Sequence, residues 1–262
     1  MMGAMELSAT LDHTVVVVDD LPVAKAELER LGFNVVMGGV NGHAENVLVV
    51  FSDESYIEFI TTAKTGLREF LRALAGFGLL GATAMLFPKP MRRYMRWFGL
   101  PAGPIDWCLA TGDLDATLRE LESSGIAVTN AFATRRTRPD GAVAEWRLGS
   151  PNELSLPFLI EDETHRRIRV PIEYASHPNG AIGFHHVTVS ENTLRSLGEN
   201  FSSAIVQLSV DGPSGAQGFT VQSRPADDQA PFNFALRFPD EIAMELIVPS
   251  GAVSSFSLEV SS

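Results

Sequence analysis

A strand–helix–strand pattern recurs three times, and this repeat limits what the chain can fold into more than any single motif does. Each copy opens with an apolar run rich in β-branched residues, which predicts a half-buried strand; the runs are residues 11–18, 105–111 and 184–189. In the first copy Asp20-Leu21-Pro22 predicts a helix start and Gly32 its end. In the second copy Asp113-Leu114 and Gly125 stand at the matching places.

Each copy is predicted to hold one helix and three further strands, which makes the unit βαβββ. The predicted helices are residues 21–31, 116–123 and 194–201, and the predicted strands are 33–37, 46–51, 56–60, 126–132, 142–148, 154–160, 205–210, 232–238 and 243–248. The predicted fold class is α+β, with three such modules forming a curved mixed-sheet cup and the helices outside. We place two modules in residues 8–165 and a third, packed on the first, in residues 180–250.

Several short motifs resemble the vicinal oxygen chelate superfamily, and its glyoxalase-like branch in particular. They are Asp12-His13-Thr14-Val15-Val16, Leu31-Gly32-Phe33, Tyr56-Ile57-Glu58-Phe59-Ile60, Leu156-Pro157-Phe158-Leu159-Ile160 and His177-Pro178-Asn179-Gly180-Ala181. The resemblance covers roughly residues 11–165. It implies the fold and leaves the reaction open, because the superfamily includes lyases, extradiol dioxygenases, epimerases, resistance enzymes and metal-free drug binders.

The resemblance also implies a metal site, in which each module gives a His from its first strand and a Glu from its last. His13 and Glu58 match in the first copy, and His186 and Glu245 match in the third. If these two copies pair, the four side chains would hold one divalent ion, Fe, Mn, Ni or Zn. A Glu not tied to the metal, Glu58 or Glu245, would then move a proton.

The second copy departs from this pattern. Trp107 stands where the His is expected, and Leu156-Pro157-Phe158 stands where the Glu is expected. If the first and second copies pair instead, only His13 and Glu58 remain, and Trp107 and Phe158 would line an apolar binding cup. Both pairings stay open at this point. The two function hypotheses follow from them: a metal-dependent lyase, isomerase or dioxygenase, or a metal-free protein that binds a small molecule.

Residues 64–104 form a long insertion between the first two copies. They contain seven Lys and Arg residues against one Glu, a net charge of +6, so the remainder of the chain carries −18. The segment is predicted to form helices at 65–75 and 91–98. As a lid, it would use Arg93 and Arg96 to attract an anionic substrate. The alternative is a packing arm or a homodimer contact.

Composition limits the partners. The net charge of −12 argues against a nucleic-acid partner, since binding phosphates needs a basic surface. A single cysteine, Cys108, excludes an internal disulfide and is expected to be a buried, inert thiol. We expect a cytoplasmic protein with a small-molecule substrate and no membrane partner. Residues 135–138 are predicted to be a solvated loop. Residues 166–169, with His165, have two interpretations, a place at the border of the cup or one at the surface, and we expect the surface.

Overall fold

The structure is a computed structural model, and it describes residues 9–41, 44–62, 66–84, 86–87, 89–138, 140–200, 220–224, 232–248 and 255–260. The first module contains β1 (Ala9–Val17), α1 (Leu21–Arg30), β2 (Val36–Asn41), β3 (Ala44–Val50) and β4 (Tyr56–Thr62). Asp20 caps α1 by accepting a hydrogen bond from the backbone N–H of Val23, and Gly32 follows the helix with φ 84°. The predicted first copy is therefore present.

The second module repeats this order with β5 (Gly103–Thr111), α5 (Leu114–Ser123), β6 (Phe132–Thr137), β7 (Val143–Gly149) and β8 (Phe158–Asp162). Asp113 caps α5 as Asp20 caps α1. Residues 126–131, predicted to be strand, form only an isolated bridge at Val128, and the strand lies at β6 instead. The predicted solvated loop at 135–138 is therefore wrong, because most of it belongs to β6.

The two modules share one eight-stranded sheet in the order β2-β3-β4-β1-β5-β8-β7-β6. They join where β1 and β5 run antiparallel, with Thr14 opposite Trp107. Each of the two strands has a register shift at this seam, which leaves Asp12 in β1 and Ile105 in β5 as extra residues. The joined modules form a curled mixed sheet, and the predicted α+β class is confirmed. It is the first and second copies that pair, so the alternative pairing of the first and third copies is wrong.

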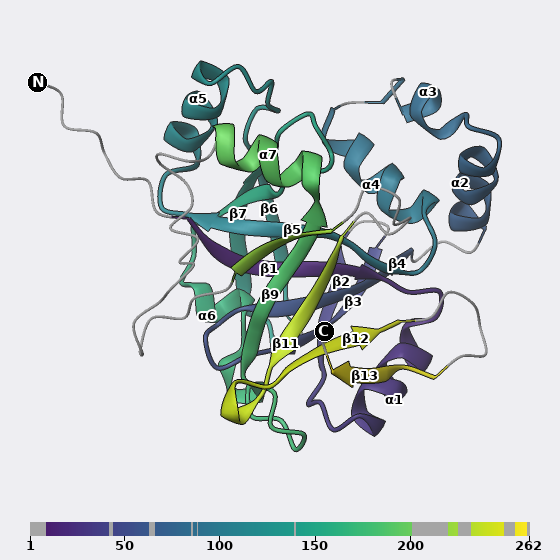
Figure 1. The fold of residues 1–262 in the computed structure, drawn as a ribbon, viewed down its shortest axis with the longest axis vertical. Helices are drawn as coiled ribbons and strands as arrows, with labels where there is room; N and C mark the ends of the chain where they lie inside the picture. Colours follow the sequence, from purple (N-terminus) through teal and green to yellow (C-terminus); the bar gives the residue numbers. More distant parts are fainter. Residues whose placement is uncertain are drawn as a thin grey trace, which may run out of the picture.

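A second sheet has the order β10-β9-β11-β12-β13. It packs against one face of the first sheet, which we call its back. Its strands are β9 (Gly183–Ser190), β10 (Thr220–Arg224), β11 (Asn233–Arg237), β12 (Ala243–Ile247) and β13 (Ser257–Val260), and α7 (Glu191–Asn200) follows β9. Figure 1 shows these strands crossing those of the first sheet, and the core between them includes Phe184 on Phe51 and Phe232 on Trp107. The predicted strand at 205–210 lies outside the described residues.

The third copy starts as predicted but continues in a different order. β10, the next strand after α7 among the described residues, pairs in parallel with β9, whereas β2 of the first module lies at the sheet edge, three places from β1. The connection into this sheet contains α6 (Arg166–Arg169) and η1 (Ile172–Tyr174), and η2 (Pro239–Glu241) precedes β12. His177 joins the two parts, because its side chain accepts from the N–H of Asn34 and lies 2.9 Å from the carbonyl of Val50.

The insertion forms three helices, α2 (Leu67–Gly76), α3 (Leu80–Ala84) and α4 (Lys89–Gly99), which we call the arm. In Figure 1 the arm lies at one corner of the molecule, with α4 beside the first sheet and α2 and α3 further out. Leu71, Met95 and Phe98 pack against Val15, Ile60 and other apolar residues on the front of the first sheet. Helices α1 and α5 pack on its back. The arm therefore covers the concave face of the sheet.

Candidate functional site

A cavity of about 650 Å³ lies between the first sheet and the arm. Its polar lining includes His13, Asn46, Glu58 and Arg136 from the first sheet, and Arg169 from α6. Its apolar lining comes from both sides; it includes Leu71, Tyr94, Phe98, Trp146 and Phe158. The arrangement suits a ligand with an apolar body and a polar end that lies on the sheet.

Asp12 and His13 are neighbours in sequence and both point to the cavity side of β1, because the extra residue at Asp12 interrupts the alternation of the strand. Both side chains are buried. The Nδ1 atom of His13 lies 2.6 Å from Oδ1 of Asp12. Tyr56 stacks on the imidazole with ring centroids 4.5 Å apart. The carboxylate and the phenol ring thus fix the orientation of His13 and the proton on its Nδ1 atom.

Glu58 faces the other nitrogen of the same imidazole. Val15 stands beside Glu58 in the β1–β4 pairing, and Oε2 of Glu58 is 3.6 Å from Nε2 of His13. Asn46 donates a hydrogen bond to the second oxygen of Glu58. With Nδ1–H donated to Asp12, both Nε2 and a carboxylate oxygen would be acceptors. Two proton acceptors thus face each other beside the cavity, an arrangement that general acid–base chemistry can use.

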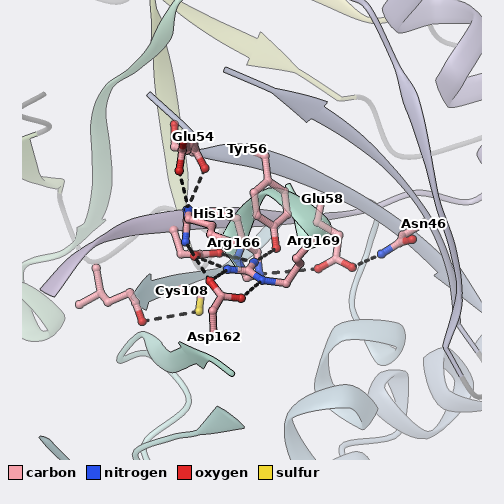
Figure 2. Close-up of polar contacts among 12 residues, drawn as sticks. His13, Asn46, Glu54, Tyr56, Glu58, Cys108, Asp162, Arg166 and Arg169 are labelled. Atoms are coloured by element: carbon pink, nitrogen blue, oxygen red, sulfur yellow. Dashed lines mark hydrogen bonds and ion pairs between the residues drawn. The ribbon is translucent and has the colours of Figure 1, made fainter. Parts of the chain in front are cut away.

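Arg169 forms an ion pair with Asp12, and Figure 2 shows its side chain beside Tyr56 and Asp162. Its two terminal nitrogens donate to the two oxygens of Asp12 at 2.9 and 2.8 Å, and it also contacts Asp162 and the hydroxyl of Tyr56. Burial by itself would raise the pKa of Asp12, but the charges of Arg169 and Arg166 and the hydrogen bond from His13 hold that pKa well below its usual value. Asp12 is therefore an anion that stays charged next to His13.

Two unpartnered polar atoms lie at the cavity wall. Nε of Arg136 and Oδ1 of Asn46 are buried and have no hydrogen-bond partner among the described residues. Both side chains belong to residues that line the cavity. Gly38 makes room for them, because a Cβ atom at that position would lie 2.1 Å from Oδ1 of Asn46. The cavity wall thus contains one buried donor and one buried acceptor without a partner among the described residues, in two residues that line the cavity.

The second module provides different residues at the matching places. The register of the seam makes Asp106, rather than the predicted Trp107, the counterpart of His13. Trp107 points to the back of the sheet and stacks on Phe232, contrary to the prediction that it lines the cup. Phe158 takes the place of Glu58 beside β5 and lines the cavity. The alternative in which the first and second copies pair and form an apolar binding cup therefore agrees with the structure for Phe158. It does not agree for Trp107.

Arg93 and Arg96 lie behind the cavity wall instead of pointing into the cavity. Arg93 donates to both oxygens of Asp106 at 2.7 and 2.6 Å, and Trp97 donates to the same carboxylate at 2.7 Å. Arg96 donates to the carbonyl of Leu154. These contacts fasten α4 to the second module. The predicted role of the two arginines in attracting a substrate is therefore replaced by one in anchoring the arm.

We expect Arg93→Met to loosen the arm. The variant keeps most of the apolar stem but leaves the buried Asp106 without its cation. Limited proteolysis should cut within residues 67–99 at least about tenfold faster, because the local opening free energy falls. Arg92→Met is the matched control, since Arg92 is a half-buried arginine of the same helix whose Nε donates to the carbonyl of Phe87 within the arm. Equal cleavage of the two variants would contradict the anchoring role.

His186 and Glu245 are on the second sheet and take no part in this cavity. They stand in one row across that sheet, with Ala235 between them in the strand pairing. Asn233 donates to Glu245 at 2.8 Å, and His186 lies 3.1 Å from the ring nitrogen of His185. The structure brings His13 and Glu58 together but does not bring the second predicted pair to them.

Sequence reasoning missed Arg136 and Arg169. Both are buried and line the cavity, whereas the sequence indicated a solvated loop and a surface segment. For Arg136 a signal existed, because Phe132, Thr134 and Arg136 alternate along one face of β6. For Arg169 there was no local signal, since its partner Asp12 is 157 residues away in the chain.

The ligand-type atoms of Asp12, His13 and Cys108 lie within 4.8 Å of one another. Both oxygens of Asp12 already accept hydrogen bonds from Arg169, and burial raises the pKa of the Cys108 thiol well above its usual value. A metal at this cluster would have to displace the thiol proton and compete with Arg169 for Asp12. On the cavity side, Nε2 of His13 and the carboxylate of Glu58 are two donors, fewer than the three or four protein ligands usual in metal sites. A divalent ion held by these two residues would need further ligands from solvent or a substrate.

Comparisons with known proteins agree with this architecture. A family profile described as "Glyoxalase-like domain" matches residues 11–205. A hypothetical protein from Staphylococcus aureus is similar over 92% of this chain and 95% of its own, with 16% identity and a TM-score of 0.60, a likeness of fold. Methylmalonyl-CoA epimerase from Mycobacterium tuberculosis shares 18% identity over 59% of this chain and 87% of its own, with a TM-score of 0.36. No curated protein matches the sequence. In the described part of the chain, no helix has the length and apolar character to cross a membrane.

Proposed function

The chain belongs to the glyoxalase-like domain family, and we propose that it is a metal-independent isomerase or lyase that moves a proton on a small amphipathic molecule bearing carbonyl or carboxylate oxygens. The observation that carries the proposal is the row Asp12–His13–Glu58 at the floor of the cavity. It joins a buried anion, an oriented imidazole and a second carboxylate, and such a row is suited to general acid–base catalysis.

In the proposed reaction the free Nε2 of His13 takes a proton from a carbon next to a carbonyl group. Asp12 stabilises the imidazolium that forms, because its own negative charge is fixed by Arg169. Glu58 exchanges the proton with His13, so that the proton returns to a neighbouring atom on the same face of the substrate. The reaction is an isomerisation with no net oxidation or reduction and needs no second reactant.

The oxygens of the substrate would lie at Arg136 and Asn46. Nε of Arg136 is a donor without a partner, and a guanidinium favours the negative charge that develops on an enolate oxygen. Oδ1 of Asn46 would accept from a substrate hydroxyl. The apolar body would lie between Phe158, Trp146 and the arm residue Phe98. This placement leaves the carbon to be deprotonated close to His13.

The test is hydrogen exchange on a panel of 2-oxo acids and 3-oxo acids with apolar side chains. In deuterated buffer the full-length protein should incorporate deuterium at the carbon next to the carbonyl of at least one compound, as measured by mass spectrometry. Prior dialysis against EDTA should leave the rate unchanged, because no step uses a metal. The proposal fails if no compound exchanges faster than in buffer. It also fails if exchange is lost with EDTA and returns with iron, manganese, nickel or zinc.

A metal-free binding protein of the sequestering type is the second candidate. The largely apolar lining and the covering arm favour it, because they provide affinity without requiring chemistry. The two candidates differ in what His13 does. A binding protein should keep the affinity of its ligand when His13 is replaced, and its wild type should show no deuterium incorporation in any ligand that it binds.

A further inference from the structure

The outer surface of the arm exposes a group of large apolar side chains that no described residue covers. Phe77 is 79% exposed, Leu86 83%, Phe70 59%, Leu79 51% and Phe87 43%. They lie within 18 residues of sequence on α2 and in the segments that flank α3, at the corner of the molecule that Figure 1 shows. The other exposed large apolar side chains of the described part, among them Val23, Val143 and Ile242, are on separate elements. Such a contiguous patch marks a contact surface.

This arm surface is continuous with the cavity. Phe70 and Phe87 are partly exposed and also line the cavity, so they belong to its rim. We take the edge formed by Phe70 and Phe87 as the entrance of the cavity, because these two side chains contact both the exposed patch and the cavity. A protein that covered the patch tightly would close this entrance. The occupant must therefore be fluid, or must itself supply the ligand.

The positive charge of the arm indicates what kind of partner its apolar surface contacts. Residues 64–104 carry +6, whereas the remainder of the chain carries −18. Asp19 pairs with Arg68 and Arg72, and Asp106 pairs with Arg93, which leaves the arm with a net +4 after these two carboxylates are included. Two arms facing each other in a dimer would repel, but a negatively charged bilayer attracts the arm and repels the acidic body.

We propose that the arm surface docks on a bilayer containing anionic lipids, with Phe77 and Leu86 inserted at the level of the headgroups. Exposed Phe and Leu side chains beside basic residues are typical of proteins that lie on a membrane without crossing it. The expectation of no membrane partner, which followed from the overall charge, is replaced for this surface because the charge is so unevenly distributed. Docking brings the rim of the cavity to the lipid phase.

The experiment is co-sedimentation of the full-length protein with vesicles of phosphatidylcholine, with and without 30 mol% phosphatidylglycerol. Wild-type protein should sediment with the anionic vesicles, and 0.5 M salt should weaken this binding several-fold. Phe77→Ser/Leu86→Ser should lower the partition coefficient at least about tenfold. Neither residue lines the cavity, and both are exposed, so the fold should be unaffected. Ile242→Ser/Val260→Ser, exposed on the second sheet, is the matched control and should bind as the wild type does.

Three results would overturn the proposal. They are no binding to anionic vesicles, equal binding by the arm variant and the wild type, or a stable wild-type dimer by light scattering that the arm variant converts to a monomer. The last result would assign the patch to a second copy of the chain. Deuterium exchange on a water-soluble oxo acid is measured without vesicles, so failure of docking and failure of the proposed catalysis can be distinguished.

Discussion

His13→Gln should lower the rate of deuterium exchange by about 10²- to 10⁴-fold, the range that a positioned general base contributes. Gln is close in size to His and can still donate to Asp12, but it has no nitrogen that takes up a proton near neutral pH. The loss should appear in kcat, while KM changes by no more than about threefold, because the apolar body and the substrate oxygens bind elsewhere. The measurement is steady-state exchange followed by mass spectrometry.

The matched control is His165→Gln. His165 is exposed and lies outside the cavity, at the start of α6. We expect its exchange rate to stay within about twofold of the wild type. Glu58→Gln should resemble His13→Gln, because it removes the acceptor that faces Nε2. A His13→Gln variant that kept half of the wild-type rate, with a wild-type circular dichroism spectrum, would show that His13 is not the base.

Asp12→Asn should lower the free energy of unfolding at pH 7 by about 3–5 kcal/mol, the range seen when one partner of a buried ion pair is removed. Asp12 is fully buried, and Arg169, buried with it, uses three hydrogen bonds on Asp12 and Tyr56. Without the charge of Asp12, the buried guanidinium keeps Asp162 as a carboxylate partner but faces a neutral amide at its other side. Urea denaturation of the wild type and the variant measures the difference.

The pH dependence gives this prediction a sign. The folded pKa of Asp12 lies below its unfolded value of about 3.9. As the pH falls through that value the unfolded chain takes up the proton first, so the contribution of Asp12 is complete at neutral pH and is lost below about pH 4. The gap between wild type and variant should therefore narrow in acid.

Asp20→Asn is the control for Asp12→Asn. Asp20 is exposed and caps α1 through a side-chain oxygen, a role that Asn fills equally well. Its unfolding free energy should stay within about 0.5 kcal/mol of the wild type at every pH. A gap for Asp12→Asn that was below 1 kcal/mol at pH 7, or that widened in acid, would contradict the assigned pairing with Arg169.

The sequence allowed the modules to be recognised because strand and helix periods, Asp caps and terminal glycines are local signals. It also indicated His13 and Glu58 correctly as neighbours, since the first strand and the last strand of a module pair in parallel. The choice of Trp107 as the counterpart of His13 was wrong, although the sequence held the signal for Asp106. Asp113 follows Asp20 by 93 residues and Gly125 follows Gly32 by 93, and the same offset from His13 leads to Asp106. The seam register agrees with this offset.

Other features depend on distant contacts. The first and second copies pair because β5 forms hydrogen bonds with the edge of β1. The alternation of apolar residues along each strand does not indicate which strand takes that edge. The burial of Arg169 depends on carboxylates of β1 and β8. Arginines at 93 and 96 read as free charges in the sequence, because their acceptors Asp106 and Leu154 come from another module.

The seam between β1 and β5 relates two halves that have specialised separately. One half keeps the imidazole and the carboxylate, while at the equivalent points the other offers Asp106, tied to the arm, and Phe158. Substitutions in the first half should therefore alter turnover, and those in the second should alter how long a bound molecule stays enclosed. Of two modules with the same fold, the first therefore carries the proposed acid–base pair, and the second holds the arm over the cavity.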